Sequence, residues 1–318
     1  MSSSPSIICI GELLVDFICD DVGVDLVSGV SYKKRAGGAP ANVCATISKM
    51  GGESIFCGKV GNDPFGHFLK ESLEDLNVNT SMVQIDETNQ TTLAFVALKE
   101  DGERDFVFNR GADRFLTEEE VDLERFKNAG ILHFGSATAL LEEPLKSTYF
   151  KLMRDYNDEH HIISFDPNYR PDLWRERELE FITLARNAIL YADFVKVSEE
   201  ELRILTAQEN IQEGVKELHQ LGADLVAVTL GKKGTFISNR TINGLVPSIK
   251  INSFDSTGAG DAFVGAFLYQ LSLEKNPQEV INDFQKIKTI TAFSNKVGAL
   301  VCEKLGAISA IPSQDELV

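Results

Sequence analysis

Short apolar runs alternate with longer amphipathic stretches along most of this 318-residue chain. Runs rich in β-branched and aromatic side chains are typical of buried strands, and stretches with one apolar face are typical of helices. The expected strands are Ile7–Ile10, Ser54–Cys57, Gly130–Phe134, His161–Phe165, Phe194–Val197 and Asp224–Leu230, and the expected helices between them include Thr117–Lys127, Leu145–Asn157 and Ile211–Leu221. This alternation predicts an α/β fold with a doubly wound, mostly parallel sheet flanked by helices.

Polar residues follow three of the expected strands directly. They are Gly11-Glu12, Asp166-Pro167-Asn168 and Ser198-Glu199. In open parallel sheets, ligands bind beyond the carboxyl ends of the strands. We therefore expect the functional site at that edge of the sheet.

One region interrupts the alternation. Thr92–Leu98 and Asp105–Asn109 have strand-like composition, and Asp101-Gly102 between them is a strong turn signal. A hairpin at this point would extend the main sheet or form a lid over the site, and its position alone favours neither. Because no internal repeat or long linker is visible, we expect a single domain over residues 1–318.

The composition is that of an ordinary globular protein, with 43% hydrophobic and 25% charged residues. The 31 basic and 48 acidic residues give a formal charge of −17, which argues against nucleic acid or an anionic membrane as a partner. No apolar run approaches the roughly 18 residues that span a bilayer, and the N-terminus does not resemble a signal peptide. The five scattered cysteines form no C-x-x-C pair, so we expect reduced thiols in a cytoplasmic protein.

The clearest chemical signal lies at Asp255–Asp261, which reads DSTGAGD. After it, Phe263, Phe267 and Leu271 recur every four residues, a spacing that predicts a helix with one buried face. Thr257 is a plausible N-cap for that helix. The residues after Thr257 then fall in its first turn, where backbone N–H groups have no partner within the helix.

Small residues in that first turn let an anion approach the N–H groups and the positive end of the helix dipole. Asp261 lies within one turn of them, close enough to accept a proton from an attacking hydroxyl. The same residues also fit close helix packing, with Asp261 stabilising the dipole. The spacing Gly258-x-Gly260 hints at dinucleotide binding, although the full G-x-G-x-x-G motif is missing there.

A second constellation is residues 36–52, which read AGGAPANVCATISKMGG. Pro40 suits a first helical turn, and Gly51 suits the position just after a helix. The paired glycines before this helix let the backbone approach a ligand, and Asn42 can project into the same space. A buried Asn in a helix of small and apolar residues needs a hydrogen-bond partner.

Six segments together resemble one family. GGAPANV (37–43), GKVGNDPFG (58–66), FVFNRGAD (106–113), SFDPNYRPDLW (164–174), DSTGAGDAF (255–263) and SNKVGALVCEKLGAISAIP (294–312) occur in this order. In sequence and spacing they are similar to the ribokinase-like (PfkB-type) carbohydrate kinases, and most of all to the fructokinase branch. The resemblance covers residues from about 6 to 312, nearly the whole chain.

The resemblance implies an ATP-dependent phosphotransferase that uses an alcohol acceptor and converts D-fructose to fructose 6-phosphate with Mg²⁺. Other kinases of the same fold, acting on 2-keto-3-deoxygluconate, ribose or a nucleoside, are alternatives, and an inactive regulatory relative is another. The fold it implies adds a small β-sheet lid, formed by segments around 13–34 and 91–110. Family members often dimerise through this lid, so a homodimer is a further expectation.

The resemblance also assigns roles to individual residues. Asp261 is expected to be the general base, with Gly258, Ala259 and Gly260 forming the anion hole. The residues expected on the sugar side are Asp16, Gly37, Gly38, Asn42, Arg110, Asn168 and Arg170. No P-loop motif occurs in the sequence, so the helix N-terminus is expected to hold the phosphates.

For ATP, the expected contacts are Lys196, Thr229, Gly231, Gly234, Asn295 and Gly298. Glu201 is expected to act on Mg²⁺ through water, as part of a motif that usually reads Asn-x-x-Glu. Here Ser198 replaces the Asn, which puts the local water network in doubt. Asp255 and Thr257 correspond to a monovalent-cation loop, which makes K⁺ a candidate ion.

Overall fold

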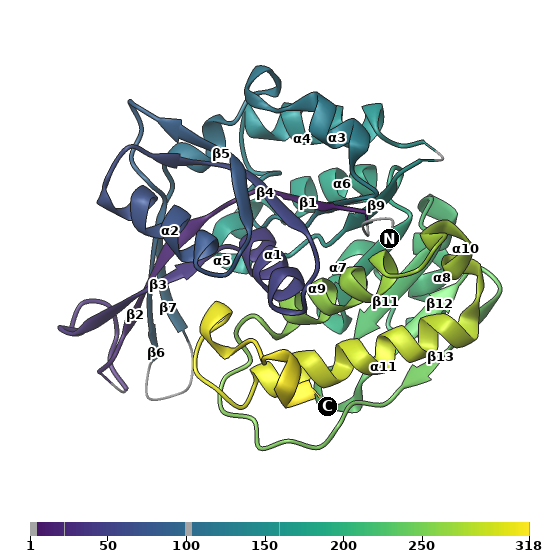
Figure 1. Ribbon diagram of the computed structural model, residues 1–318. Helices are drawn as coiled ribbons and strands as arrows, with labels where there is room; N and C mark the ends of the chain where they lie inside the picture. Colours follow the sequence, from purple (N-terminus) through teal and green to yellow (C-terminus); the bar gives the residue numbers. More distant parts are fainter. Residues whose placement is uncertain (1–4, 22, 99–103, 159, 318) are drawn as a thin grey trace.

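The computed structural model of the protein describes residues 5–21, 23–98, 104–158 and 160–317. Within these residues the larger sheet has nine strands, in the order β13-β12-β11-β10-β9-β8-β1-β4-β5 (Figure 1). Their bounds are β1 Ile7–Ile10, β4 Ser54–Gly61, β5 Asn79–Asp86, β8 Ile131–Phe134, β9 Ile162–Phe165, β10 Phe194–Ser198, β11 Leu225–Thr229, β12 Thr235–Asn239 and β13 Ile242–Val246. Strands β5 to β11 in this order pair in parallel, and β12 and β13 are antiparallel. The predicted mostly parallel sheet is confirmed.

Helices cover both faces of this sheet (Figure 1). One face carries α1 (Ala39–Lys49), α2 (Pro64–Glu74), α9 (Ala259–Ser272), α10 (Pro277–Asn282) and α11 (Phe284–Val301), and the other carries α3 (Leu123–Asn128), α4 (Leu145–Asp155), α5 (Pro171–Trp174), α6 (Glu178–Ile189), α7 (Glu199–Thr206) and α8 (Ile211–Leu221). Strand β1 shows why both faces are covered. Its side chains alternate between the two faces. Ile7 and Cys9 pack into the hydrophobic core on the face covered by α1 and α9, and Ile8 and Ile10 pack into the core on the face covered by α4 and α6.

Short 3-10 turns lie in the connections, at Ala112–Phe115, Glu118–Glu120, Arg175–Arg177, Gly231–Lys233, Ile308–Ala310 and Gln314–Leu317. The single helix expected over Thr117–Lys127 is wrong. Thr117 forms a capping box for the turn that follows it, and Asp122 then caps α3 separately through Arg125 N. The two caps break the helix because each satisfies the backbone groups at its own helix start.

A second sheet has four strands in the described residues, in the order β3-β2-β6-β7. Their bounds are β2 Leu14–Cys19, β3 Tyr32–Gly37, β6 Leu93–Leu98 and β7 Arg104–Asn109. The β6-β7 hairpin therefore pairs with the earlier β2-β3 pair and does not extend the large sheet. Its expected turn, Asp101-Gly102, lies outside the described residues.

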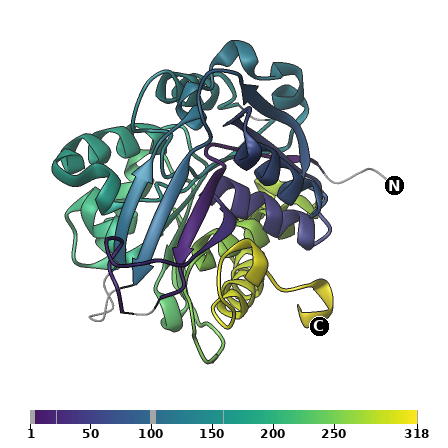
Figure 2. The same cartoon turned by 90° about the vertical axis from the view of Figure 1, so that its left-hand side faces the viewer.

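The small sheet stands at one side of the molecule, and Figure 2 turns that side toward the viewer. The yellow C-terminal turns lie next to it in that view, and Arg35 NH1 of β3 donates to Ser309 Oγ at 3.0 Å. Strand register places Asp16 and Phe108 on one face of the sheet. Phe17 lies on the opposite face and packs edge-on against Phe65 of α2, with 5.6 Å between the ring centroids.

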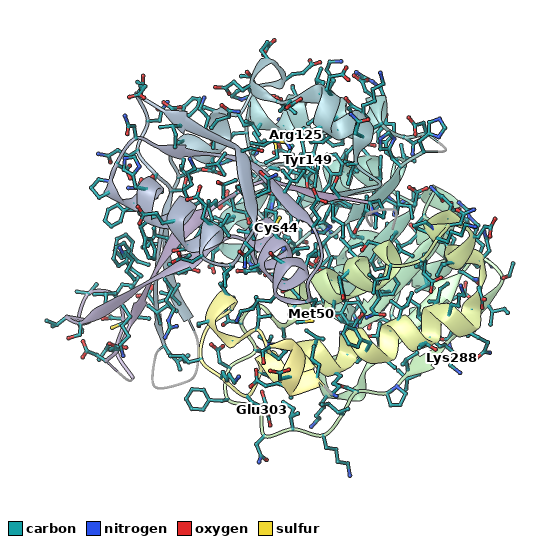
Figure 3. The ribbon with its side chains drawn as sticks, in the orientation of Figure 1. Cys44, Met50, Arg125, Tyr149, Lys288 and Glu303 are labelled. Carbon is teal, nitrogen blue, oxygen red and sulfur yellow. The ribbon has the colours of Figure 1, made fainter. Side chains whose placement is uncertain are left out.

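All five cysteines are free thiols, as expected from the sequence. Cys44 and Tyr149 lie in the interior, and Lys288 and Glu303 lie on the surface (Figure 3). Among the residues that the structure describes, no helix is both long enough and apolar enough to cross a lipid bilayer.

Candidate active site

Helix α9 begins at Ala259, with Gly258 as its N-cap in the left-handed conformation (φ 76°). A Cβ atom at Gly258 would lie 2.4 Å from the Cβ of Ala307, so only glycine fits this position. The expected N-cap, Thr257, is wrong by one residue. Within the described part of the chain, no side chain caps the N–H groups of this first turn.

Thr257 serves the loop before the helix. Its N–H and hydroxyl both donate to Asp255 Oδ1, at 3.0 and 2.6 Å, and Gly306 N donates to Asp255 Oδ2 at 3.0 Å. Asp255 therefore joins the loop before α9 to the segment that follows α11.

The carboxylate of Asp261 lies in the first turn of α9 and is buried, with 8% of the residue exposed. Asn42 Nδ2 of helix α1 donates to Asp261 Oδ2 at 2.7 Å. Asp261 is thus the hydrogen-bond partner that was expected for a buried Asn42. The Asn42 Oδ1 atom is buried and has no hydrogen-bond partner among the described residues, so it remains available to a ligand.

Burial raises the pKa of Asp261, because the ionised carboxylate loses its hydration. Hydrogen bonds from Asn42 and Asn168 and the positive charges of Arg170 and Lys196 offset part of this rise. These four side chains come from α1, the loop after β9 and strand β10. The structure therefore gathers them around the start of α9, and a raised pKa makes Asp261 a better proton acceptor.

Lys196 of β10 and Asp166 after β9 form a buried ion pair, with Nζ 2.8 Å from Oδ2. The Lys196 Nζ also lies 3.1 Å from the point where a Cβ of Gly260 would stand, so the ammonium is beside the first turn of α9. Burial raises the pKa of Asp166 to about 6, and the charges of Glu201 and Asp261 add to the rise while Lys196 opposes it.

For Lys196 itself, burial lowers the pKa, but the charges of Asp166, Glu201 and Asp261 outweigh that effect and raise it, so the side chain stays protonated. Asp166 was not among the residues assigned from the sequence. Its position directly after a strand was the only signal that could have found it.

On the expected sugar side, Asp16 and Gly37 are in contact. A Cβ at Gly37 would stand 2.1 Å from Asp16 Oδ2, so the carboxylate lies directly against this glycine. Asn168 has a positive φ of 49° and donates through Nδ2 to Gly135 O at 3.2 Å. Arg170 is exposed, and its NH1 donates to Tyr169 O at 3.0 Å.

Arg110 follows β7 and lines a cavity of about 230 Å³ between the small sheet and the segments that follow β8 and β9 of the large sheet. The lining residues are Phe106, Phe108, Arg110, Leu141, Glu142, Asp172, Leu173, Arg175 and Arg177. Nε of Arg110 donates to Asp113 Oδ2 at 3.2 Å. Its NH1 and NH2 atoms are buried and have no hydrogen-bond partner among the described residues. The sequence assigned Arg110 to the site and missed Asp113.

The expected nucleotide turn follows β11. Thr229 ends the strand opposite Ser198 of β10, at the carboxyl edge of the sheet. Gly231 and Gly234 both have positive φ angles, 56° and 104°, on either side of the 3-10 turn. Lys232 and Lys233 in this turn are exposed.

Asn295 and Gly298 of α11 have structural roles that the sequence did not reveal. The Asn295 amide accepts from Thr235 Oγ1 at 2.6 Å and donates to Val246 O at 2.9 Å, which ties α11 to β12 and β13. A Cβ at Gly298 would lie 2.9 Å from Ala259 O, so this glycine lets α11 approach the start of α9. Their expected contacts with adenine stay predictions.

Ser198 and Glu201 form a capping box at the start of α7. Ser198 Oγ accepts from Glu201 N at 3.1 Å, and Glu201 Oε2 accepts from Ser198 N at 2.6 Å. Glu201 Oε1 accepts from Tyr169 N at 2.8 Å. The serine that replaces the usual Asn is therefore a good helix cap. Among the described residues, no group of three His, Cys, Asp or Glu side chains is placed to hold a metal directly.

A family model described as pfkB family carbohydrate kinase matches residues 4–314. Probable fructokinase-5 of Arabidopsis thaliana is 39% identical over 318 residues, which covers 98% of this chain and 96% of the relative. A fructokinase from Xylella fastidiosa, solved with bound ATP, is 33% identical with a TM-score of 0.90 and coverage of 99% and 97%. A double-mutant fructokinase from Vibrio cholerae, solved with fructose, ADP and a potassium ion, is 33% identical with a TM-score of 0.88 and coverage of 100% and 98%.

Proposed function

The chain belongs to the pfkB family of carbohydrate kinases, and we propose that it is a fructokinase that transfers the γ-phosphoryl group of ATP to the 6-hydroxyl of D-fructose. The observation that carries the chemistry is the buried Asp261 carboxylate, one turn inside the N-terminus of α9 and hydrogen-bonded by Asn42. The choice of fructose is supported by the 39% identity to a plant fructokinase and by the two similar bacterial structures, both of fructokinases.

In the proposed reaction, Asp261 accepts the proton of the attacking sugar hydroxyl. The hydroxyl oxygen bonds to the γ-phosphorus, the bond from phosphorus to the β–γ bridging oxygen breaks, and ADP leaves with the electron pair. We propose that the N–H groups at Gly258, Ala259 and Gly260 stabilise the charge of the transferring group, with the N–H of Ala259 turning from Ser256 O, to which it donates at 3.2 Å. The Lys196 ammonium beside Gly260 adds a positive charge at the same place. Positioning and charge supply most of the catalysis in such transfers.

We infer that the sugar lies between the small sheet and the start of α9. Asp16 accepts hydrogen bonds from two sugar hydroxyls, and the backbone at Gly37 and Gly38 lines the same pocket. The remaining contacts on the sugar side are Asn42, Arg110, Asn168 and Arg170. Asn42 and Arg110 each bring a buried polar atom with no partner among the described residues, which supports a ligand there. The small sheet, formed by segments around 13–34 and 91–110, would then act as a lid.

For ATP, we propose contacts at Lys196, Thr229, Gly231, Gly234, Asn295 and Gly298. Mg²⁺ bound with ATP would neutralise charge on the phosphate oxygens. The negative charges of the buried acids Asp166, Glu201 and Asp261 raise the pKa of Lys196. The same charges would attract a second cation, such as Mg²⁺, to this place. Mg²⁺ in kinases is held largely by phosphates and water, which fits a Glu201 whose two oxygens already accept backbone N–H groups.

A monovalent cation and self-association complete the proposal. The loop that Asp255 and Thr257 build with Gly306 is the proposed K⁺ site, and the similar Vibrio cholerae structure contains a potassium ion.

Val27 and Val30, which connect β2 to β3, are 92% and 84% exposed. We propose that they contact a second copy of this chain, which light scattering of the protein and of a Val27→Asp/Val30→Asp variant would test.

The experiment that tests the function is a substrate panel with ATP and Mg²⁺. ADP formation is measured with fructose, ribose, 2-keto-3-deoxygluconate and adenosine, and fructose is expected to give the highest kcat/KM. A higher kcat/KM for another acceptor would overturn the choice of sugar. Failure with every acceptor would overturn the kinase activity itself and favour the regulatory alternative.

A further inference from the structure

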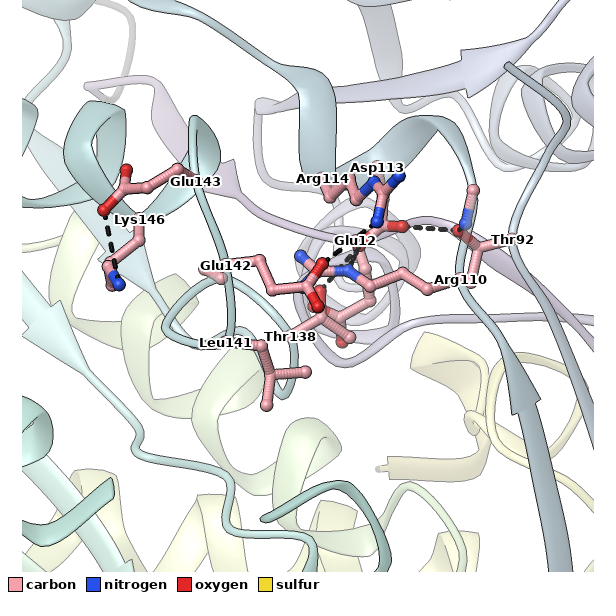
Figure 4. A network of polar contacts seen from close by, with 12 residues as sticks. Glu12, Thr92, Arg110, Asp113, Arg114, Thr138, Leu141, Glu142, Glu143 and Lys146 are labelled. Carbon is pink, nitrogen blue, oxygen red and sulfur yellow. Dashed lines mark hydrogen bonds and ion pairs between the residues drawn. The ribbon is translucent and has the colours of Figure 1, made fainter. Parts of the chain in front are cut away.

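Asp113 is a buried acid at the junction of the two sheets. Its side chain is 0% exposed, and it lies in the 3-10 turn that follows β7. The carboxylate accepts hydrogen bonds from three side chains: Thr92 Oγ1 donates to Oδ1, Thr138 Oγ1 donates to Oδ2 at 2.8 Å, and Arg110 Nε donates to Oδ2 at 3.2 Å (Figure 4). A fully buried carboxylate is stable only when such donors surround it.

Two of these donors fix the base of the small sheet. Thr92 immediately precedes β6 and Arg110 immediately follows β7, so Asp113 binds both ends of the β6-β7 hairpin. The Thr92 hydroxyl also accepts from Gly111 N at 2.8 Å. The donors therefore hold the two chain ends of the hairpin to one carboxylate.

The third donor belongs to the large sheet's side of the junction. Thr138 lies in the loop after β8, and its Oγ1 is 3.5 Å from Glu12 Oε2. Glu12 Oε1 in turn accepts from Ala39 N at 2.9 Å, at the first residue of α1. Helix α1 carries Asn42, which holds Asp261. Asp113 thus connects Thr92, at the base of the β6-β7 hairpin, through Thr138 and Glu12 to helix α1, which positions Asp261.

The hydrogen bond from Arg110 to Asp113 fixes the arginine side chain and leaves its terminal nitrogens without partners among the described residues. Its Nε is occupied by Asp113, and its two terminal nitrogens are buried without hydrogen-bond partners among the described residues. A second acid, Glu142, is 3.8 Å from NH1, is 46% exposed and pairs more closely with Arg114, at 3.2 Å. A flexible arginine side chain loses rotamer freedom when it binds a ligand, so an arginine fixed in advance binds at lower cost.

We propose that Asp113 is a positioning residue that holds the open side of the Arg110 guanidinium toward the bound sugar and sets its place relative to helix α1. This inference rests on the proposed sugar kinase activity. Asp113 does not touch the substrate; it acts through Arg110. Its loss is therefore expected to weaken sugar binding and to leave ATP binding unchanged.

The test is Asp113→Asn, assayed with whichever sugar the wild-type protein phosphorylates best. The amide has the shape of the acid but carries no negative charge to hold the guanidinium, and its NH₂ group cannot accept, so either Thr92 or the pair of Arg110 and Thr138 loses its acceptor. The sugar KM is expected to rise by roughly 10–100-fold, with the ATP KM within about twofold of wild type. Because the sugar is chosen by assay, an inactive result with fructose counts against the choice of fructose and not against Asp113.

Two comparisons separate positioning from general damage. Glu142→Gln removes the exposed acid near the same arginine, and its effect on the sugar KM is expected to be under about threefold. Arg110→Met combined with Asp113→Asn is expected to match Arg110→Met alone, because both changes act on one group. Additive effects, an equal rise of both KM values, or an unchanged sugar KM in Asp113→Asn would each overturn the proposal.

Discussion

Asn42 Nδ2 donates to Asp261 Oδ2 at 2.7 Å, and this bond joins helices α1 and α9 across 219 positions of sequence. Both side chains are buried. The bond fixes the orientation of the carboxylate and stabilises its ionised form, while burial works in the opposite direction. The reactivity of Asp261 is therefore set by a balance that substitution of either residue disturbs.

Asp261→Asn tests the proposed base directly. The amide keeps the size of the side chain but has no carboxylate to accept the proton, so kcat is expected to fall by roughly 10²–10⁴-fold or more. The KM for ATP is expected to change little. Steady-state kinetics measures kcat and the KM for ATP, and a thermal melt of the same sample checks that the variant is folded. A kcat near that of wild type would refute the assigned role.

Asn42→Ala is expected to move the acid limb of the pH profile. The Asn42 hydrogen bond lowers the pKa of Asp261, so its loss raises that pKa further. Only the ionised carboxylate accepts the proton, and activity therefore falls as pH drops through this pKa. A hydrogen bond to a charged group contributes about 1.5–3 kcal/mol, so the limb of kcat/KM should shift upward by about one to two pH units. An unshifted limb would show that the bond does not tune Asp261.

The sequence revealed the parts of the fold whose patterns are local. Strand β1 is apolar at every position and buried on both faces, so its apolar run stands out. Strand β13 was missed because it is an edge strand with mostly exposed side chains, and such a strand has no continuous apolar run. The helix expected over Thr117–Lys127 failed because the cap at Asp122 outweighed its apolar periodicity.

At the site, composition indicated Asp261 and Asn42, because small residues around a polar one are unusual. It did not indicate Asp113, and it indicated Asp166 and Glu12 only as polar residues that directly follow an expected strand. All three are buried, and a buried acid looks the same in a sequence as a solvated one. Their importance depends on partners from distant segments, which no local pattern contains.

Lys196→Met is expected to impair both activity and stability, and a second substitution separates the two effects. The change removes the charge beside Gly260 and leaves Asp166 buried without its 2.8 Å partner, which should cost about 3–5 kcal/mol of unfolding free energy. Lys196→Met with Asp166→Asn removes both charges, so stability should largely return while kcat/KM stays low. Denaturant unfolding and kinetics on both variants measure this. A double variant that regains activity would show that Lys196 serves only the fold.

Ser198 is expected to act as a helix cap. Ser198→Ala removes the acceptor for Glu201 N and should lower the unfolding free energy by about 1 kcal/mol. Ser198→Asn, which introduces the residue that the family motif is expected to carry, keeps a good cap and should leave stability within about 0.5 kcal/mol of wild type. The Mg²⁺ concentration for half-maximal rate is expected to be the same in all three proteins. A marked rise in that concentration for Ser198→Ala would place Ser198 at the metal.

The partly buried Asp193 carboxyl is expected to oppose folding at neutral pH. It lies between α6 and β10, where burial raises its pKa from 3.8 to about 6, and the charge of Asp224 adds to the rise. Between these two values the folded protein keeps a proton that the unfolded chain has released. Stability therefore declines as pH rises through this window, and above about pH 6 the cost approaches 3 kcal/mol.

Asp193→Asn should remove that cost, because the amide oxygen can still accept from Ile163 N, which donates to Asp193 Oδ2 at 2.7 Å. The expected gain in unfolding free energy is about 1–3 kcal/mol at pH 8 and close to zero near pH 4. Asp224→Asn, at a side chain 45% exposed, removes only the neighbouring charge that adds to the rise and should change stability by less than about 1 kcal/mol. Urea unfolding at both pH values decides the matter. Since only a titrating group produces a difference between the two pH values, an equal gain at both would trace the effect to packing and not to the buried charge.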